Sequence, residues 1–138
     1  MYGRCPRARC LRHTGRYSMF KDWPNIATEL TGLVKQLRVG VPDTMKAFGA
    51  LAQAATQAKA LDTKTKELIA LGIAVAVRCE PCITFHVESA RKNGATRDEV
   101  METVGMAIYM GAGPSVMYAA EAVEAYDQYA AKAAVAAE

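Results

Sequence analysis

The sequence lacks both the apolar–polar alternation that would predict β-strands and an apolar run long enough to cross a bilayer. Its longest uncharged apolar run, residues 68–77, is far shorter than the about 20 residues that a membrane-spanning helix needs. Aromatic residues make up only 7% of the chain, whereas 51% of the residues are hydrophobic and many of these are alanine. Alanine has the highest helix propensity of all residues. We therefore predict an all-α protein that does not span a membrane.

Acidic residues are absent from residues 1–18, which contain five arginines. The net charge of the whole chain is +3, but residues 19–138 differ in sign. They contain 12 of the 17 basic residues and all 14 acidic residues, so their net charge is about −2. Residues 19–138 contain no basic stripe with interleaved aromatics, so we expect no nucleic-acid partner. We interpret residues 1–18 as a basic, disordered leader or extension, with Met19 as the natural start. This segment lacks the apolar core of a secretory signal, and we expect a cytoplasmic protein.

The chain of 138 residues fits one domain, which we place at residues 19–138. Apolar residues recur there at helical spacing, and glycines and prolines separate the periodic segments. Asp62 and Thr96 are placed to cap helices, and the stretch 111–114 should end one. The third periodic segment is apolar nearly all round, so we expect it to be covered on several sides. We predict about six helices, at approximately residues 24–37, 43–59, 63–80, 82–93, 97–110 and 115–134.

Cysteine is scarce, with four in the whole chain, yet two of them form the motif Cys79-Glu80-Pro81-Cys82. At a helix start, such a pair can close a disulfide across one turn, and the helix dipole favours the thiolate form. His86 follows Cys82 by one helical turn, where it could accept a proton from the thiol or return one. Because thiolate is the nucleophile in disulfide exchange and in peroxide reduction, the motif predicts thiol–disulfide redox chemistry.

Two other interpretations of the cysteine pair stay open at this point. Cys79, Cys82 and His86 could be three ligands of a zinc ion, with Glu67 or a cysteine of the extension as the fourth. Alternatively, both thiols could be small buried apolar groups without chemistry, and His86 a hydrogen-bonded core residue. Haem attachment is excluded, because Ile83 stands where that motif requires histidine.

A set of four residues is more specific than the cysteine pair. Glu67, Cys79, Cys82 and His86 are separated by eleven, two and three intervening residues. This spacing, with the sequence on both sides of it, resembles the alkyl hydroperoxidase D-like branch of the carboxymuconolactone decarboxylase superfamily. The resemblance covers approximately residues 24–127.

The resemblance implies an all-helical subunit that assembles into a homotrimer or homohexamer. It also implies a disulfide-cycling site in which Glu67 and His86 relay protons to the thiols. By position, Cys82 is then the attacking thiol and Cys79 the resolving thiol. The relatives that decarboxylate muconolactones generally lack the cysteine pair, so the pair argues against that activity here.

We predict a thiol–disulfide oxidoreductase of the peroxidase type that uses Cys82, Cys79, His86 and Glu67 and needs no cofactor or metal. Its substrate would be a hydroperoxide or a disulfide, and its partner a thiol reductant protein or a peroxiredoxin. One alternative is a non-enzymatic metal-binding or redox-sensing oligomer. The other is a decarboxylase-like enzyme in which His86 and Glu67 do acid–base work.

The proposed relay sets a geometric condition on the fold. If the chain from Glu67 to Cys79 were one straight helix, these two residues would lie about 18 Å apart. We therefore predict a break between Arg78 and Pro81 that lets the Cys82 helix pack back along the Glu67 helix.

Overall fold

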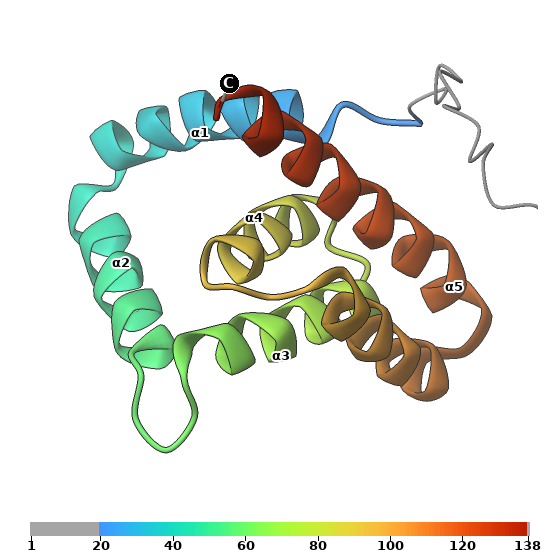
Figure 1. The fold of residues 1–138 in the computed structure, drawn as a ribbon. Coiled ribbons are helices and arrows are strands. Elements are labelled where there is room, and N and C mark those ends of the chain that lie inside the picture. Colours follow the sequence, from blue (N-terminus) through green and yellow to red (C-terminus); the bar gives the residue numbers. More distant parts are fainter. Residues whose placement is uncertain (1–19, 138) are drawn as a thin grey trace, which may run out of the picture.

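Side-chain caps and chain breaks set where the helices of this protein begin and end. The computed structural model describes residues 20–137, so the predicted extension, residues 1–18, lies outside the described residues. The described residues form helices and no strands, which confirms the all-α prediction. None of these helices combines the length and the apolar character needed to cross a membrane. Figure 1 shows them in chain order: α1 (Trp23–Gly40), α2 (Pro42–Thr56), α3 (Thr63–Ala76), α4 (Glu80–Lys92) and α5 (Arg97–Val135).

The helices α3 and α5 begin at the caps that the sequence predicts. The Asp62 carboxylate accepts a hydrogen bond from the Thr65 N–H at 2.7 Å, and its hydrogen bonds with Thr65 lower the pKa of Asp62. Thr96 and Glu99 form a capping box, in which each side chain accepts a hydrogen bond from the other residue's backbone N–H. Local sequence signals therefore fix the starts of both helices that frame the centre of the fold.

The ends of the first two helices differ from the prediction. The helix α1 continues to Gly40 and is longer than expected, whereas α2 ends at Thr56 and is shorter. The Lys66 ammonium donates hydrogen bonds to the Ala55 and Gln57 carbonyls at 2.9 Å and 2.7 Å. Because carbonyls at a helix end have no partner within the helix, a lysine from α3 stabilises the earlier end of α2.

The long helix α5 consists of two helical arms joined at a sharp reversal. Ala112 leaves helical backbone geometry, with φ 52° and ψ −147°. In one straight helix, Arg97 and Asp127 would lie about 45 Å apart. Their side chains are instead joined by hydrogen bonds of 2.8 Å and 3.1 Å, and Figure 1 shows the two arms running in opposite directions. The predicted break at residues 111–114 is confirmed, and the second arm corresponds to the sixth predicted helix.

The helix α4 lies in the centre of the fold, where α1, α3 and α5 pack around it (Figure 1). Its residues Ile83 and Val87 are fully buried against Leu71 and Val75 of α3. Full burial of a side chain of this size stabilises a protein by about 1.5–3 kcal/mol. Small side chains let α5 approach this layer closely, and its buried alanines are Ala107, Ala119, Ala122 and Ala125.

The helices α4 and α5 cover α3 on several sides, as predicted, but one apolar face of α3 is left uncovered. Ile69, Ile73 and Val77 are 48%, 57% and 65% exposed. Ile69 and Ile73 line an open apolar groove of about 480 Å³ together with Met106 and Met110 of α5. The other helices within residues 20–137 pack against different faces of α3, so one copy of the chain leaves this apolar face in water.

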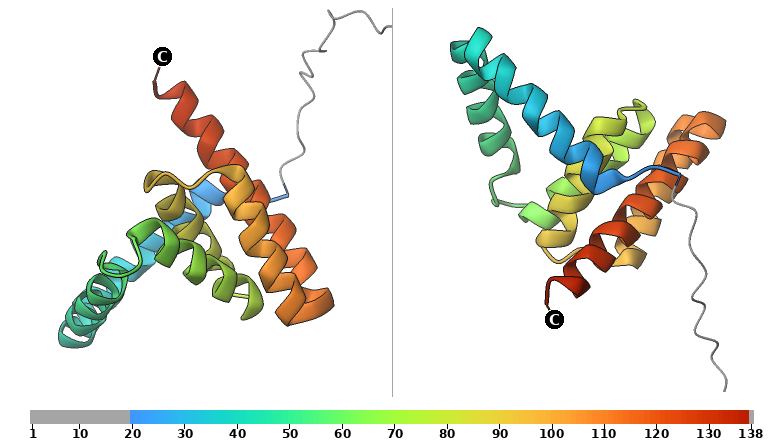
Figure 2. Two further views of the ribbon diagram at one scale, coloured as in Figure 1. Left: turned by 60° about the horizontal axis from the view of Figure 1, so that its bottom comes forward. Right: turned by 90° about the horizontal axis from the view of Figure 1, so that it is seen from above.

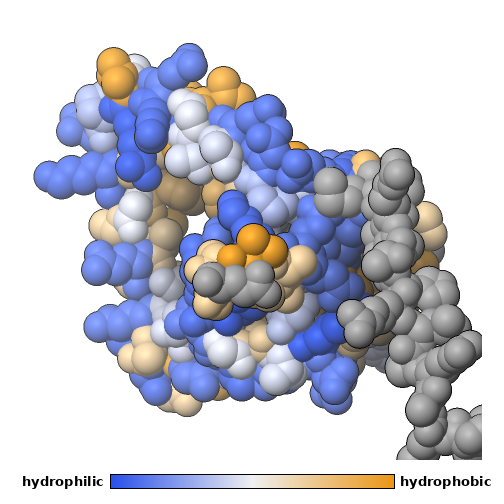
Figure 3. All heavy atoms as spheres, turned by 45° about the horizontal axis from the view of Figure 1, so that its top comes forward, coloured by the Kyte–Doolittle hydropathy of each residue, from blue (hydrophilic) through white to orange (hydrophobic). Residues whose placement is uncertain are grey.

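The later part of α1 and the whole of α2 form an arm that stands away from the other helices, whereas the start of α1, with the buried Trp23 and Ala27, packs on the core. Both views of Figure 2 show this arm projecting from them, and Figure 3 shows a hollow beside it. The helix α2 contains no buried residue, although Phe48 and Leu51 are apolar, and Leu33 and Leu37 of α1 are exposed as well. A helix this short is marginally stable alone in water, and α2 presents its apolar side chains on an exposed surface.

Replacement of Ala112 with glycine should stabilise the protein by about 1 kcal/mol. The positive φ of Ala112 costs a residue with a Cβ about 1–2 kcal/mol, and glycine removes most of this strain. The matched control is A120G, because Ala120 is exposed in the regular second arm of α5 and glycine there should destabilise by about 1 kcal/mol. Urea denaturation measures both changes in the free energy of unfolding. Equal destabilisation by the two substitutions would show that the reversal at Ala112 is not strained.

Candidate functional site

A tight reversal separates α3 from α4. Arg78 has a φ of 61°, in the left-handed region in which helices commonly end. The Arg78 N–H donates to the Val75 carbonyl at 3.2 Å, and the Cys79 N–H donates to the Ala74 carbonyl at 2.9 Å. These two hydrogen bonds make a Schellman motif, which satisfies the last carbonyls of α3. The predicted break is present, and α4 packs back along α3 (Figure 1).

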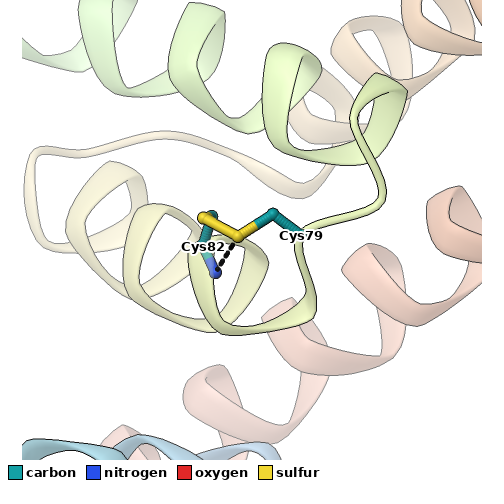
Figure 4. The surroundings of a disulfide bond; sticks show 2 residues. All are labelled: Cys79 and Cys82. Atoms are coloured by element: carbon teal, nitrogen blue, oxygen red, sulfur yellow. Dashed lines mark hydrogen bonds between the residues drawn. A yellow bond between two sulfur atoms is a disulfide. The ribbon is translucent and has the colours of Figure 1, made fainter.

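Cys79 and Cys82 form a disulfide at the start of α4, with their Cα atoms 5.2 Å apart (Figure 4). Cys79 is the N-cap residue, and its Sγ accepts a hydrogen bond from the Cys82 N–H at 3.3 Å. Pro81 suits the first turn, where a missing N–H leaves no helical hydrogen bond unmade. After reduction of the disulfide, the same N–H and the helix dipole would stabilise negative charge on the Cys79 sulfur.

Glu67 and His86 are in direct contact between α3 and α4. The Glu67 Oε2 lies 2.7 Å from the His86 Nδ1. The Glu67 side chain is 7% exposed, whereas the imidazole is 34% exposed. The reversal at Arg78 thus meets the geometric condition, because it brings the carboxylate of α3 against a residue of the cysteine-bearing helix. The catalytic role of this pair stays a prediction.

The buried carboxylate determines which nitrogen of the imidazole carries a proton. When the Glu67 carboxylate carries no proton it only accepts hydrogen bonds, and the Nδ1 of His86 is then the donor. On a neutral ring, the Nε2 then has no proton and can act as a base. His86 lies one turn after Cys82, on the same side of α4. Transfer of a proton between this pair and the Cys82 thiol stays a prediction.

The Thr84 hydroxyl holds α4 in place between the cysteines and the histidine. It donates a hydrogen bond to the Trp23 carbonyl at 3.0 Å, so the Tyr129 hydroxyl, 2.8 Å away, donates to it in turn. All three residues are buried. Burial raises the pKa of Tyr129, so its hydroxyl keeps its proton at neutral pH. The network ties the first turns of α4 to α1 and to the second arm of α5.

The surroundings of the site show how its residues stand to a possible metal ion and to the apolar groove. Within residues 20–137, no three or more histidine, cysteine, aspartate or glutamate side chains gather in a way that could hold a metal ion. Cys79 and Cys82, which the zinc interpretation requires as ligands, are bonded to each other. The apolar groove between α3 and α5 is lined by none of the four candidate residues. The candidate chemistry and the groove therefore lie on different faces of α3.

Lys21 is a charged residue at the motif that the sequence did not predict. The Nζ of Lys21, which precedes α1, lies 2.7 Å from the Oε2 of Glu80 and 3.0 Å from the Oε2 of Glu121. Burial lowers the pKa of Lys21, but the hydrogen bonds to both carboxylates outweigh this effect and leave the pKa raised. No local pattern predicts this contact, because its three residues lie far apart in the sequence and meet only in the folded chain.

Comparisons with known proteins agree on one family. The sequence model of the Carboxymuconolactone decarboxylase family matches residues 42–125, a range that contains all four candidate residues. An uncharacterised protein of Haemophilus influenzae is 41% identical over 108 residues, which are 78% of this chain and 96% of that protein.

Two solved structures resemble the fold closely. A carboxymuconolactone decarboxylase family protein from Legionella pneumophila matches with a TM-score of 0.76 at 50% identity, over 78% of this chain and 96% of that chain. A family member from Thermotoga maritima, for which a part in the antioxidative response has been suggested, matches with a TM-score of 0.68 at 27% identity, over 75% of this chain and 88% of that chain. The matches therefore extend over most of each relative's length.

Replacement of Tyr129 with phenylalanine should destabilise the protein by about 1 kcal/mol, because the buried Thr84 hydroxyl loses its donor. The matched control is Y118F, since the half-buried Tyr118 packs against the same core and its hydroxyl has no partner among the described residues. Chemical denaturation of both variants measures the change in the free energy of unfolding that each substitution causes. An equal change in the two free energies of unfolding would mean that the Thr84 network does not hold α4.

Proposed function

The chain belongs to the carboxymuconolactone decarboxylase family, and we propose that it is a thiol–disulfide oxidoreductase of the peroxidase type. The observation that carries this proposal is the placement of the Cys79–Cys82 disulfide one turn from the Glu67–His86 pair. The substrate would be a hydroperoxide, or the disulfide of a peroxiredoxin partner. The dithiol itself carries the electrons, so the reaction needs no further cofactor.

The proposed cycle begins with the reduced dithiol. The Cys82 thiolate attacks the hydroperoxide, the O–O bond breaks, an alcohol leaves and Cys82 becomes a sulfenic acid. The Cys79 thiol then loses its proton and attacks the Cys82 sulfur, which forms the disulfide, and the departing hydroxide takes up a proton and leaves as water. A dithiol reductant restores both thiols by disulfide exchange. One hydroperoxide is reduced to an alcohol and water for each donor dithiol that is oxidised to a disulfide.

His86 would carry the protons in this cycle. Its Nε2 takes the proton from the Cys82 thiol and gives it to the departing alkoxide. Glu67 holds the ring in one tautomer and stabilises the imidazolium that forms. When the reductant attacks the Cys82 sulfur, the N-cap hydrogen bond assists the departure of Cys79 as a thiolate, because a stabilised thiolate is the better leaving group.

The reducing half of the cycle points to a partner and a location. A thiol reductant protein would supply electrons to the disulfide, and a peroxiredoxin partner would accept them from the dithiol. Thiol reductants keep thiols reduced in the cytoplasm, where we place the reaction. The suggested antioxidative role of the Thermotoga maritima relative supports the same direction of chemistry.

We also propose that the chain assembles with copies of itself into a homotrimer or homohexamer. The arm formed by the later part of α1 and the whole of α2 exposes Phe48 and Leu51, and the groove between α3 and α5 exposes Ile69 and Ile73. Docking of the arm of one copy into the groove of the next would remove both apolar surfaces from water. A contact between two different surfaces closes into a ring when the rotation between copies permits, which is the symmetry of a trimer.

A second candidate function uses the Glu67–His86 pair alone. The hydrogen bond between these residues does not involve the thiols, so the pair could act as an acid–base catalyst on a lactone or a carboxylated ring. The family's name favours this candidate, whereas the cysteine pair favours the redox function. Activity that survives in a C79S/C82S variant and is lost in E67Q would support the acid–base candidate over the redox proposal.

Serine substitutions of the two cysteines should separate their roles. The C82S variant should not react with hydroperoxide at all, because it lacks the attacking thiol. The C79S variant should consume one equivalent and stop, because the Cys82 sulfenic acid cannot be resolved. Stopped-flow measurement of hydroperoxide consumption distinguishes a single turnover from no reaction, and peptide mass spectrometry locates the added oxygen on Cys82.

The wild-type protein provides the control for this experiment. Exposure to hydroperoxide should remove the free thiols of Cys79 and Cys82, and a dithiol reductant should restore them. A burst in C82S with none in C79S would reverse the assignment of the two cysteines. Wild-type turnover in the C82S variant would refute the dithiol mechanism.

Replacement of Phe48 with aspartate should break the proposed assembly. A carboxylate at position 48 would be hydrated in the separated chain but buried without a partner in the assembly, which is costly. The mass measured by sedimentation equilibrium should therefore fall to that of one chain. The Q53D variant is the matched control, because it adds the same charge to α2 at a polar position. A wild-type protein that sediments as a monomer, or an F48D variant of unchanged mass, would contradict the proposed interface.

A further inference from the structure

The glutamate between the two cysteines is bound by a lysine from a remote segment. The Lys21 Nζ lies 2.7 Å from the Glu80 Oε2 and 3.0 Å from the Glu121 Oε2. The side chain of Lys21 is 22% exposed, and those of Glu80 and Glu121 are 40% and 13% exposed. Lys21 therefore lies between two carboxylates in a partly buried site, where salt screens an ion pair less than it does at an open surface.

The segment that carries Lys21 is fixed on the second arm of α5. The Gln128 amide accepts a hydrogen bond from the Trp23 N–H at 2.9 Å and donates one to the Lys21 carbonyl at 2.6 Å. The fully buried Trp23 also donates its indole N–H to the Glu124 carboxylate at 3.0 Å. The backbone on either side of the Lys21 side chain is thus anchored, so the ammonium reaches Glu80 from a fixed position.

An unpaired carboxylate at Glu80 would oppose thiolate formation. Glu80 is the first residue of α4, so its charge competes with a thiolate for the positive potential of the helix start. It also repels a second negative charge on the neighbouring sulfurs. The other charged groups at the motif are Arg78 before it, Glu121 on α5, and the Glu67–His86 pair one turn beyond. Lys21 is the cation that binds Glu80 directly.

We propose that Lys21 is a positioning residue for the dithiol: it neutralises Glu80 and so keeps this carboxylate from opposing thiolate formation at Cys79 and Cys82. The inference rests on the proposed function, which makes the thiolate the reactive form. Lys21 acts through Glu80, so its effect on the thiols should disappear when Glu80 carries no charge. Its effect should also depend on positive charge and not on the exact shape of the side chain.

Alkylation of the reduced, full-length protein tests the proposal without any hydroperoxide. Iodoacetamide reacts with thiolates, so the pH dependence of its rate reports the thiolate population. Peptide mass spectrometry assigns the reaction to Cys79 and Cys82 and separates it from the other cysteines. We expect K21M to slow alkylation at pH 7 about fivefold and to move the profile to higher pH. The K21R variant should keep the wild-type profile.

The E80Q variant decides whether Lys21 acts through Glu80. E80Q should be alkylated about as fast as the wild type, because Lys21 already neutralises Glu80 there. K21M/E80Q should react as fast as E80Q alone and faster than K21M. The matched control is K64M, which breaks the 2.6 Å Lys64–Glu99 ion pair near the opposite end of α3 and should leave the profile unchanged.

Two results would overturn the proposal. One is an equal slowing by K21M in the wild-type and E80Q backgrounds, which would mean that the lysine charge acts directly on the sulfurs. The other is slower alkylation of E80Q than of the wild type, which would mean that Glu80 favours the thiolates, and this result decides the question even if circular dichroism shows that K21M folds poorly. Failure of the wild-type protein to reduce hydroperoxides would count against the proposed function and leave this alkylation experiment interpretable.

Discussion

The reversal of the chain at Arg78 is the constraint on which the rest of the structure depends. One left-handed residue ends α3 and turns α4 back along it, so the apolar face around Ile83 fills the centre of the fold. The same turn makes Cys79 the N-cap of α4 and brings His86 against Glu67. The core and the candidate site are consequences of one backbone feature, and neither could change without disturbing the other.

The buried Glu67 links the core to the candidate site. A carboxylate in an apolar interface is costly unless a hydrogen-bonding partner meets it, and loss of one partner of a buried pair costs about 3–5 kcal/mol. Glu67 is buried in the same helix face as Leu71 and Val75, and His86 supplies its hydrogen bond. Packing of α4 thus fixes the pair in one geometry, while the partly exposed imidazole stays accessible to protons.

Features set by neighbouring residues were predictable, and features set by remote contacts were not. The Asp62 cap, the Thr96 capping box and the break before Pro81 follow from local sequence. The packing of α4 back along α3 is predicted from the relay between Glu67 and the thiols that the family resemblance implies. The contact of Lys21 with the motif joins segments that only folding brings together. The apolar pattern of α3 predicted cover on several sides, but periodicity does not tell whether the same chain supplies that cover.

Backbone strain falls at the positions that assemble the motif. Glycine would adopt the left-handed conformation of Arg78 at lower cost, yet the arginine puts a positive charge beside Cys79. Ala112 is the other residue with a Cβ and a positive φ among residues 20–137, and it turns the second arm of α5 back along the first. That arm carries Glu121 and Gln128, which hold Lys21 against the cysteine motif. The two strained residues therefore both shape the surroundings of the cysteine motif. Arg78 turns the helix that carries Cys82 back onto the core, and Ala112 turns back the arm that holds Lys21.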